Sequence, residues 1–447
     1  MRQILDGLLG REGGERVAGR LARGSTGTFG LTVVSKGLSF ATGVFLARVL
    51  DASGYGAYSF AISWVVLLFV FAVMGMNRLL IREFAVYNER AEWGRMRGMM
   101  RRADQIGLSN SLLLALLVGG LAWLLGGSAG SSLVSALLVG LVLLPLQTLI
   151  GLRQSAMQGL EYIVRGQVPG RLVQPLLLLL LLLIVYLLDL FELTAVRALG
   201  LQILTMVTAL IIAHRLLKRS LPGEVMRTPA VYETRAWVKS AMPLLLVGSM
   251  LIVNQRADVI MVGAILGDAP TGIYNAAARW AEGISIVLTS VNVALAPTLA
   301  AIHARGDMAH LQRVITRSTR AIFLLSVPAA LVLFIFGYWL LLIFGPEYTP
   351  GLTALRILAA GHLFSASVGS VGALLVMTGR DREAALAVTV SGVLNIGLNA
   401  ALIPAYGIEG AAVATVASLV VWNLIMVVMA RRRLGILPGV IGPLERG

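Results

Sequence analysis

The segment NQRADVIMVGAILGDAPTGIYNAAARWAE, residues 254–282, consists of an apolar run, a turn and a second largely apolar run. Asp268 and Pro270 occupy the turn, and four charged residues lie within the two runs: Arg256, Asp258, Arg279 and Glu282. A hydrocarbon core about 30 Å thick is crossed by about 20 apolar residues in helical form. The segment therefore predicts two membrane-spanning helices that carry charges inside the bilayer.

Twelve apolar stretches run along the 447-residue chain, which is 57% hydrophobic and 13% charged. Backbone amides in lipid must pair within their own segment, so we expect every stretch to be a helix. The expected spans are residues 28–50, 58–76, 108–125, 132–152, 172–188, 194–214, 242–266, 271–302, 321–344, 352–377, 384–403 and 410–430. The sequence thus predicts an all-α polytopic membrane protein with 12 transmembrane helices.

Basic residues gather on alternate sides of these stretches. The segment before the first stretch, those after even-numbered stretches and the C-terminal tail contain 31 of the 37 Lys and Arg residues. Most odd-numbered stretches are followed by acids instead: Asp51, Asp189, Glu192, Asp268, Glu347 and Glu409. Cytoplasmic loops accumulate Lys and Arg, which places both termini in the cytoplasm. The expected location of the protein is the cell (inner or plasma) membrane. The same topology explains the net charge of +15. Nucleic acid is therefore not an expected partner, whereas membrane lipids are.

The longest polar segments divide the chain. Residues 215–239 follow six stretches and precede six more, which predicts a cytoplasmic linker between two six-helix bundles, 28–214 and 240–430. Residues 1–27 form a basic cytoplasmic segment ahead of a helix expected to act as an uncleaved signal-anchor, and residues 431–447 form a cytoplasmic tail. Segments 77–105, 159–170 and 303–320 predict surface elements at the cytoplasmic interface, with partner binding as the alternative for the first and last.

A weak internal repeat supports two halves. VLDASGYGAYSFA, residues 49–61, resembles ILGDAPTGIYNAA, residues 265–277, and their G-x-Y elements begin at Gly56 and Gly272, 216 residues apart. Parallel repeats related by an axis along the membrane normal are a known transporter design. Chance similarity between two turns is the alternative.

The charged residues around the turn at Asp268 occur at matched depths. Asp258 is nearly level with Arg279, and Arg256 with Glu282, about 15–20 Å from the turn at 1.5 Å per residue. Charges at this depth are costly and usually face a partner or a cavity. They could form two ion pairs that help the hairpin insert. Alternatively, they line an aqueous cavity and exchange partners as it opens.

Other internal charges favour an anionic passenger. Lys36 lies about a third of the way into the first span, and Arg48, Arg197 and Arg356 lie near the periplasmic ends of theirs. The three arginines could instead extend to the interface. Together with the hairpin residues, the spans contain six basic and two acidic residues. A phosphate would bind such guanidinium groups bidentately, whereas a cationic drug would not.

The remaining polar residues carry weaker signals. Asn395 and Asn399 share one helix face, where hydrogen bonding between helices is favoured over substrate contact. His362 could take part in proton coupling, although a locally satisfied histidine is the simpler interpretation. The sequence contains no P-loop motif, and no Ser/His/Asp set or metal-ligand spacing can be assembled from it. We therefore expect neither an enzyme nor a metal or other cofactor, with coupling to H+ or Na+ left open.

Three stretches resemble the polysaccharide transporter family, the Wzx-type flippases of the multidrug/oligosaccharidyl-lipid/polysaccharide exporter (MOP) superfamily. They are residues 36–61, residues 254–282, and LNAALIPAYGIEGAAVATVAS at 398–418. The resemblance implies a MATE-like, inverted-V pair of six-helix bundles around a central cavity. It also implies a function: moving polyprenyl-pyrophosphate-linked oligosaccharide from the cytoplasmic to the outer leaflet by alternating access, for polysaccharide or O-antigen biosynthesis. The cavity-lining charges of the family match Arg256, Asp258, Arg279 and Glu282, with Lys36 as a further candidate.

Three alternative functions would each require a different feature. A multidrug cation antiporter of the same fold would need surplus buried acid. A membrane glycan polymerase or glycosyltransferase would need a large periplasmic loop. A scaffold for glycan-assembly enzymes would need only binding surfaces, and such polymerases and glycosyltransferases are also conceivable partners of a flippase.

Overall fold

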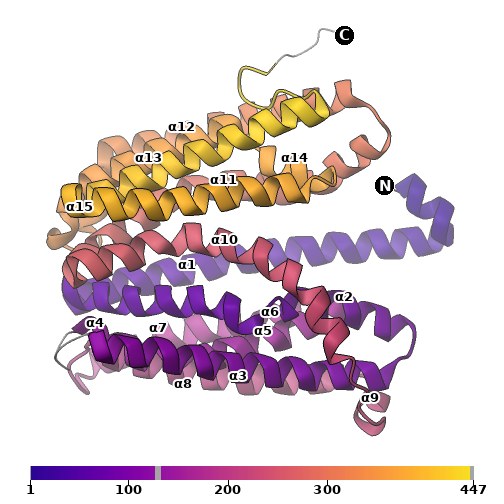
Figure 1. Ribbon diagram of the computed structural model, residues 1–447, viewed down its shortest axis with the longest axis horizontal. Helices are drawn as coiled ribbons and strands as arrows, with labels where there is room; N and C mark the ends of the chain where they lie inside the picture. Colours follow the sequence, from indigo (N-terminus) through magenta and orange to yellow (C-terminus); the bar gives the residue numbers. More distant parts are fainter. Residues whose placement is uncertain (1, 126–131, 443–447) are drawn as a thin grey trace. The chain divides into compact units, whose positions relative to one another are not determined.

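The computed structural model describes the backbone of residues 2–125 and 132–442. It does not describe the side chains of residues 2–29, 125, 243, 246–248, 293 and 294, so the predicted basic N-terminal segment and the end of the tail lie largely outside the described residues. The elements are α1 (Arg2–Val73), α2 (Met76–Glu89), α3 (Trp93–Leu125), α4 (Ser132–Leu141), α5 (Leu143–Gly159), α6 (Ile163–Val168), a π-helical turn (Pro169–Val173), α7 (Gln174–Leu187), α8 (Ala195–Ser220), α9 (Gly223–Arg227), α10 (Thr234–Leu266), α11 (Asp268–Ala304), α12 (Met308–Leu342), a 3-10 turn (Pro346–Gly351), α13 (Leu352–Val368), α14 (Val371–Met377) and α15 (Asp381–Leu434) (Figure 1).

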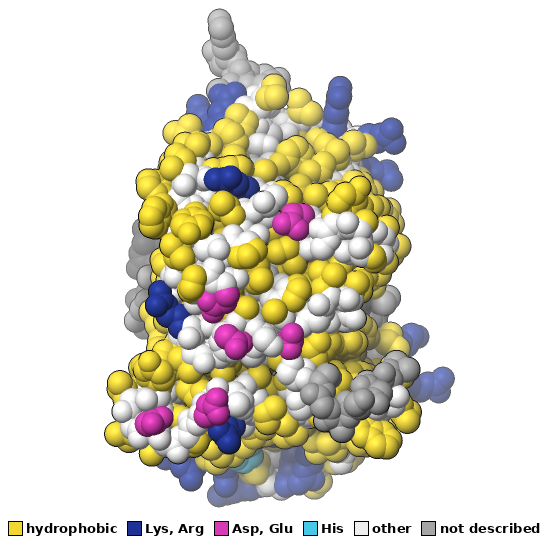
Figure 2. Space-filling view, turned by 90° about the vertical axis from the view of Figure 1, so that its left-hand side faces the viewer, with side chains coloured by type: hydrophobic (Ala, Val, Ile, Leu, Met, Phe, Trp, Pro, Cys, Tyr) yellow, Lys and Arg dark blue, Asp and Glu magenta, His cyan; other side chains and the backbone are white. Residues whose placement is uncertain are grey.

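Many of these helices are suited to a membrane. Within the described ranges, nine are long and apolar enough to cross a bilayer, or ten if the bent α11 counts as one span. The 43° bend lies just before Pro297. A proline ring clashes with the carbonyl four residues earlier, which accounts for a kink at this point. The chain is therefore a multi-pass, all-helical membrane protein. Figure 2 shows one of its faces, where acidic side chains are scattered among hydrophobic ones.

The two longest helices are interrupted by left-handed residues. Asp51 in α1 has a φ of 58°, and Gly407 in α15 has a φ of 59° with a non-helical ψ of −139°. In Figure 1 the ribbon of each element turns back on itself. Hydrogen bonds from Ser391 and Asn395 to Ser418 join the two arms of α15. Each of these elements thus consists of two helical arms rather than one rod.

The chain forms two compact units. The first comprises Met1–Leu50 and Ala61–Ile252, and the second comprises Asp51–Phe60 and Val253–Gly447. The short segment Asp51–Phe60, where α1 turns, therefore packs with the second unit although both of its flanks belong to the first.

In the first unit, α2 has an apolar face that is buried in protein. Met76, Leu79, Leu80 and Phe84 are almost fully buried against a cluster that includes Met96 of α3. The sequence predicted a helix at the membrane interface here, and the structure adds that its apolar face is packed inside the unit. An interfacial helix and a helix packed on protein share the same pattern, so hydrophobic spacing alone cannot separate the two.

The predicted linker is attached to the same region of the first unit. The Val231 backbone N–H donates to the carbonyl oxygen of Gly94 at 2.9 Å, and Arg97 donates to the carbonyl oxygen of Thr228 at 2.8 Å. A Cβ atom at Gly98 would lie 1.8 Å from the carbonyl oxygen of Val231, so only glycine allows this approach. The linker is thus held against the start of α3 by backbone contacts.

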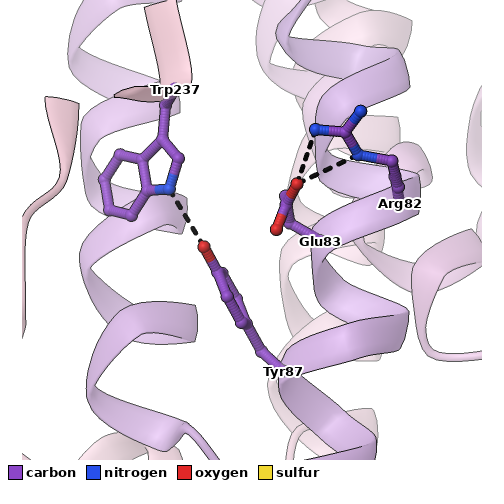
Figure 3. Close-up of polar contacts among 4 residues, drawn as sticks. All are labelled: Arg82, Glu83, Tyr87 and Trp237. Atoms are coloured by element: carbon purple, nitrogen blue, oxygen red, sulfur yellow. Dashed lines mark hydrogen bonds and ion pairs between the residues drawn. The ribbon is translucent and has the colours of Figure 1, made fainter. Parts of the chain in front are cut away.

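A buried hydrogen bond completes the attachment. The indole N–H of Trp237 in α10 donates to the hydroxyl of Tyr87 in α2 at 3.0 Å, with both rings buried (Figure 3). Burial raises the pKa of the Tyr87 hydroxyl above its usual value, so it stays protonated at neutral pH. On the preceding turn of α2, Arg82 bonds its neighbour Glu83 at 2.7 Å, and this pair at the surface has a small energetic value.

Replacing Tyr87 by phenylalanine is expected to lower the unfolding free energy by about 1–3 kcal/mol, because it leaves a buried indole N–H without an acceptor. Tyr232→Phe is the matched control, since Tyr232 is exposed and stacks under Arg102 through its ring, which phenylalanine keeps. The measurement is the thermal unfolding midpoint of purified protein. Equal midpoints for the two variants would show that the buried bond contributes nothing.

In the second unit, two glycine-containing turns approach each other very closely. A Cβ atom at Gly56 would lie 1.8 Å from the carbonyl oxygen of Asp268, and one at Gly272 would lie 2.1 Å from that of Ala52. Ser59 accepts a hydrogen bond of 2.8 Å from Asn275, which lies 216 residues later. These are equivalent positions of the two repeat copies, so the copies contact each other through matching residues.

Candidate functional site

The hairpin between α10 and α11 carries the four charged residues singled out from the sequence. Its turn is formed by Gly267, with a φ of 92°, and by Asp268, whose side chain accepts from the Ala269 N–H at 2.9 Å. The Thr271 hydroxyl donates to the carbonyl oxygen of Gly267 at 2.6 Å. These local bonds place the start of α11 directly after the end of α10, as the turn sequence predicted.

Asp258 is the buried acid of the site, with 5% of its surface exposed. Its carboxylate accepts hydrogen bonds from the hydroxyls of Tyr274 at 2.6 Å and Thr415 at 3.1 Å, and from the Val259 N–H at 3.1 Å. Tyr274 lies in α11 and Thr415 in the second arm of α15. The carboxylate therefore joins three helices through neutral donors. The sequence pointed to Arg279 as its neighbour in depth and did not single out either hydroxyl.

Asn275 makes a second buried connection, one residue after Tyr274. Its amide donates to the hydroxyls of Tyr55 at 3.1 Å and Ser59 at 2.8 Å, and all three side chains are buried. Tyr55 and Ser59 belong to the α1 segment that packs with the second unit. The repeated G-x-Y elements were visible in the sequence, but the sequence did not show that the two copies contact each other.

The two arginines of the hairpin are half-buried. The Nε atom of Arg256 is buried and has no hydrogen-bond acceptor among the described residues. Arg279 interacts electrostatically with Tyr58. Unpaired buried donors are rare in native proteins and call for an explanation such as an unseen ligand. Arg256 is thus a half-buried arginine whose Nε–H is not paired with any described residue.

Glu282 and His362 lie near each other in the second unit. Glu282 is exposed and interacts electrostatically with the imidazole of His362 in α13. The Nδ1 atom of His362 lies 2.8 Å from the hydroxyl oxygen of Ser285, and the two groups form a hydrogen bond. Ser285 lies about one helix turn after Glu282 in α11. The histidine therefore has a local polar partner, as the simpler interpretation of the sequence expected.

Asn395 and Asn399 are fully buried in the first arm of α15. Asn399 donates to the side-chain oxygen of Asn395 at 3.1 Å, and Asn395 donates to the Ser418 hydroxyl in the second arm at 3.2 Å. These contacts support the favoured prediction, which was hydrogen bonding between helices.

The other basic candidates are exposed. Arg197 donates to the carbonyl oxygen of Glu192 at 2.6 Å and stacks on the ring of Phe191, and Arg356 donates to the carbonyl oxygen of Phe334 at 3.0 Å. These local contacts account for Arg197 and Arg356 without a substrate. Lys36 and Arg48 are exposed in the first unit.

Two solved structures with a similar fold are transporters by their descriptions. An inward-facing multidrug resistance MATE family transporter of the MOP superfamily is similar, with a TM-score of 0.71 and 13% identity, covering 89% of this chain and 94% of that one. The lipid II flippase MurJ in an inward closed conformation is similar with a TM-score of 0.67 and 13% identity, covering 91% and 87%. At this identity the likeness concerns the fold alone.

The sequence relationship is more specific. The chain belongs to the polysaccharide biosynthesis protein family, whose model matches residues 21–303, and the model for lipid II flippase MurJ matches residues 193–441. The probable low-salt glycan biosynthesis flippase Agl15 of Haloferax volcanii is 30% identical over 165 residues, covering 37% of this chain and 35% of the relative. The probable flippase AglR of the same organism is 24% identical over 177 residues, covering 38% and 36%. The chain thus aligns with about a third of the length of these relatives, both of which are named as probable flippases.

Proposed function

We propose that this protein is a flippase for lipid-linked glycans in the plasma membrane. Arg256 is the observation that carries the proposal, because its buried Nε atom has no acceptor among the described residues and suits a phosphate oxygen. The flippase names of the MurJ model and of Agl15 support the same passenger class. More specifically, the passenger is a polyprenyl-pyrophosphate-linked oligosaccharide, moved from the cytoplasmic to the outer leaflet by alternating access.

The proposed topology has twelve crossings with both termini in the cytoplasm. The left-handed residues Asp51 and Gly407 each divide a long apolar helix into two arms, which adds two crossings to the ten counted over the described ranges. The alternation of 31 of the 37 basic residues supports the orientation. On this basis the two six-helix bundles are residues 28–214 and 240–430, joined by the linker at 215–239.

The proposed roles of the site residues follow from their contacts. Arg256 and Arg279 bind the pyrophosphate, and Lys36 contributes a further positive charge along the route. Asp258 positions α10, α11 and α15 through its hydroxyl partners, so that the arginines are presented on a fixed hairpin. Glu282 balances the arginine charge when the passenger is absent.

A gradient of H+ or Na+ or the membrane potential drives transport, since one charge crossing 100 mV is worth about 2.3 kcal/mol.

The test is to delete the gene and analyse lipid extracts by mass spectrometry. We expect a polyprenyl-pyrophosphate-linked oligosaccharide to accumulate on the cytoplasmic side, with surface glycan lost and both effects reversed by the plasmid-borne chain. Unchanged lipid-linked sugars, together with increased sensitivity to cationic drugs, would contradict the proposal and favour an antiporter instead.

A further inference from the structure

A groove lies between the start of the first arm of α15 and the end of its second arm. It has a volume of about 590 Å³, and Arg382 and Leu386 line one side while Leu424, Val428 and Arg432 line the other. Farther along both arms, the Ser391 hydroxyl donates to the carbonyl oxygen of Ser418 at 3.0 Å, and this hydrogen bond joins the two arms. The groove therefore begins where this hydrogen-bonded part of the arm pair ends.

The walls of the groove are apolar and face the surroundings. Leu386 is 53% exposed, Leu424 is 49% exposed and Val428 is 47% exposed. In a membrane protein, apolar side chains that remain exposed along a spanning helix contact acyl chains. The exposed side chains continue from Leu386 to Val390 and Val393 on the same arm, so an acyl chain has an apolar surface to follow away from the groove.

The open end of the groove is basic. Glu383 lies 3.5 Å from the Nη1 atom of Arg380 and 3.9 Å from the Nε atom of Arg433, so this single acid is shared by two arginines. Arg382 and Arg432 are exposed, and neither makes a hydrogen bond or ion pair within the part of the chain that is described. Two guanidinium groups are thus left uncompensated beside an apolar channel.

We propose that this groove is a binding site for an anionic phospholipid. The phosphodiester lies between Arg382 and Arg432, where guanidinium groups form bidentate, charge-assisted hydrogen bonds, and the acyl chains lie along Leu386, Leu424 and Val428. A zwitterionic lipid offers the same chains but carries a cationic group that the arginines repel. All of its residues lie in α15, outside the hairpin of α10 and α11.

Native mass spectrometry of the full-length protein in detergent tests the proposal, with phosphatidylglycerol and phosphatidylcholine added in separate titrations. We expect the native protein to retain one phosphatidylglycerol in preference to phosphatidylcholine. The double variant Arg382→Gln/Arg432→Gln is expected to bind phosphatidylglycerol about thirtyfold more weakly, since each basic side chain near a lipid surface contributes about fivefold.

The double variant Arg305→Gln/Arg317→Gln is the matched control. It removes two exposed arginines from the second unit that do not line the groove, and we expect its phosphatidylglycerol affinity to be unchanged. An equal loss in both double variants would overturn the proposal, because it would show only general attraction to a basic surface. Equal retention of the two lipids by the native protein would also overturn it, as would a dimer that dissociates in the groove variant, which would identify a second chain as the occupant.

Discussion

Replacement of Gly272 by valine is expected to abolish the recovery of folded protein. A Cβ atom at this position would lie 2.1 Å from the carbonyl oxygen of Ala52, and the opposing Gly56 would meet the carbonyl oxygen of Asp268 at 1.8 Å. Both obstacles are backbone atoms, so relief requires a helix to move rather than a side chain to rotate. Overpacking a core by methylenes typically costs about 1–3 kcal/mol, and a Cβ atom 2.1 Å from a backbone oxygen belongs at or above the upper end.

Fluorescence-detected size exclusion of the detergent extract measures this effect, with Gly56→Val expected to behave in the same way. Gly283→Ala is the control on the same helix, because nothing lies within 4 Å of its added Cβ atom. That change is expected to leave the unfolding midpoint unchanged or to raise it, since alanine favours helix over glycine by about 1 kcal/mol. A monodisperse Gly272→Val protein with a native midpoint would show that the two turns are not in contact.

The contact between the repeat copies also shows where sequence reasoning stops. The similarity of residues 49–61 and 265–277 could be read directly, and so could their separation of 216 residues. Their mutual contact, with Ser59 bonded to Asn275, could not be read, because similarity between two segments carries no information about their distance in space. Only the glycines gave a physical hint, since glycine allows close backbone approach.

Helix positions were largely predictable because the bilayer fixes their length and polarity. The predicted start at residue 194 matches α8, where the Thr194 hydroxyl accepts from the Arg197 N–H as an N-cap, and the predicted end at 266 matches that of α10. The environment of α2 was not predictable in this way. Its spacing of apolar residues fits a lipid surface and a protein surface equally well, and tertiary packing selected the latter.

The candidate site was predictable as a place but not as a network. Depth matching along the hairpin put Asp258 level with part of α11, and the structure shows that the α11 side chain facing it is Tyr274. Equal depth cannot choose among neighbouring helix faces, and Thr415 lies 157 residues away in sequence, so no local pattern could reveal it. The roles of Arg256, Arg279, Glu282 and Lys36 in transport stay predictions.

Replacing Arg256 by alanine is expected to reduce glycan export by about 10- to 100-fold while leaving the protein folded. A hydrogen bond to a charged group contributes about 1.5–3 kcal/mol, so the loss of one such bond to a pyrophosphate accounts for a reduction of this size. Stability should not suffer, because no described residue accepts a hydrogen bond from the Nε atom of Arg256.

The measurement is the rate at which surface glycan reappears after induction in a gene-deleted strain, with insertion checked by size exclusion. Arg256→Lys keeps the charge but not the bidentate geometry, so export between that of alanine and the native residue would indicate phosphate recognition rather than charge alone. Arg305→Ala, which removes an exposed arginine at the end of α11, controls for net charge. If Arg256→Ala exports at the native rate, the free guanidinium group has no part in holding the passenger, and Arg279 must be tested as the principal anion contact instead.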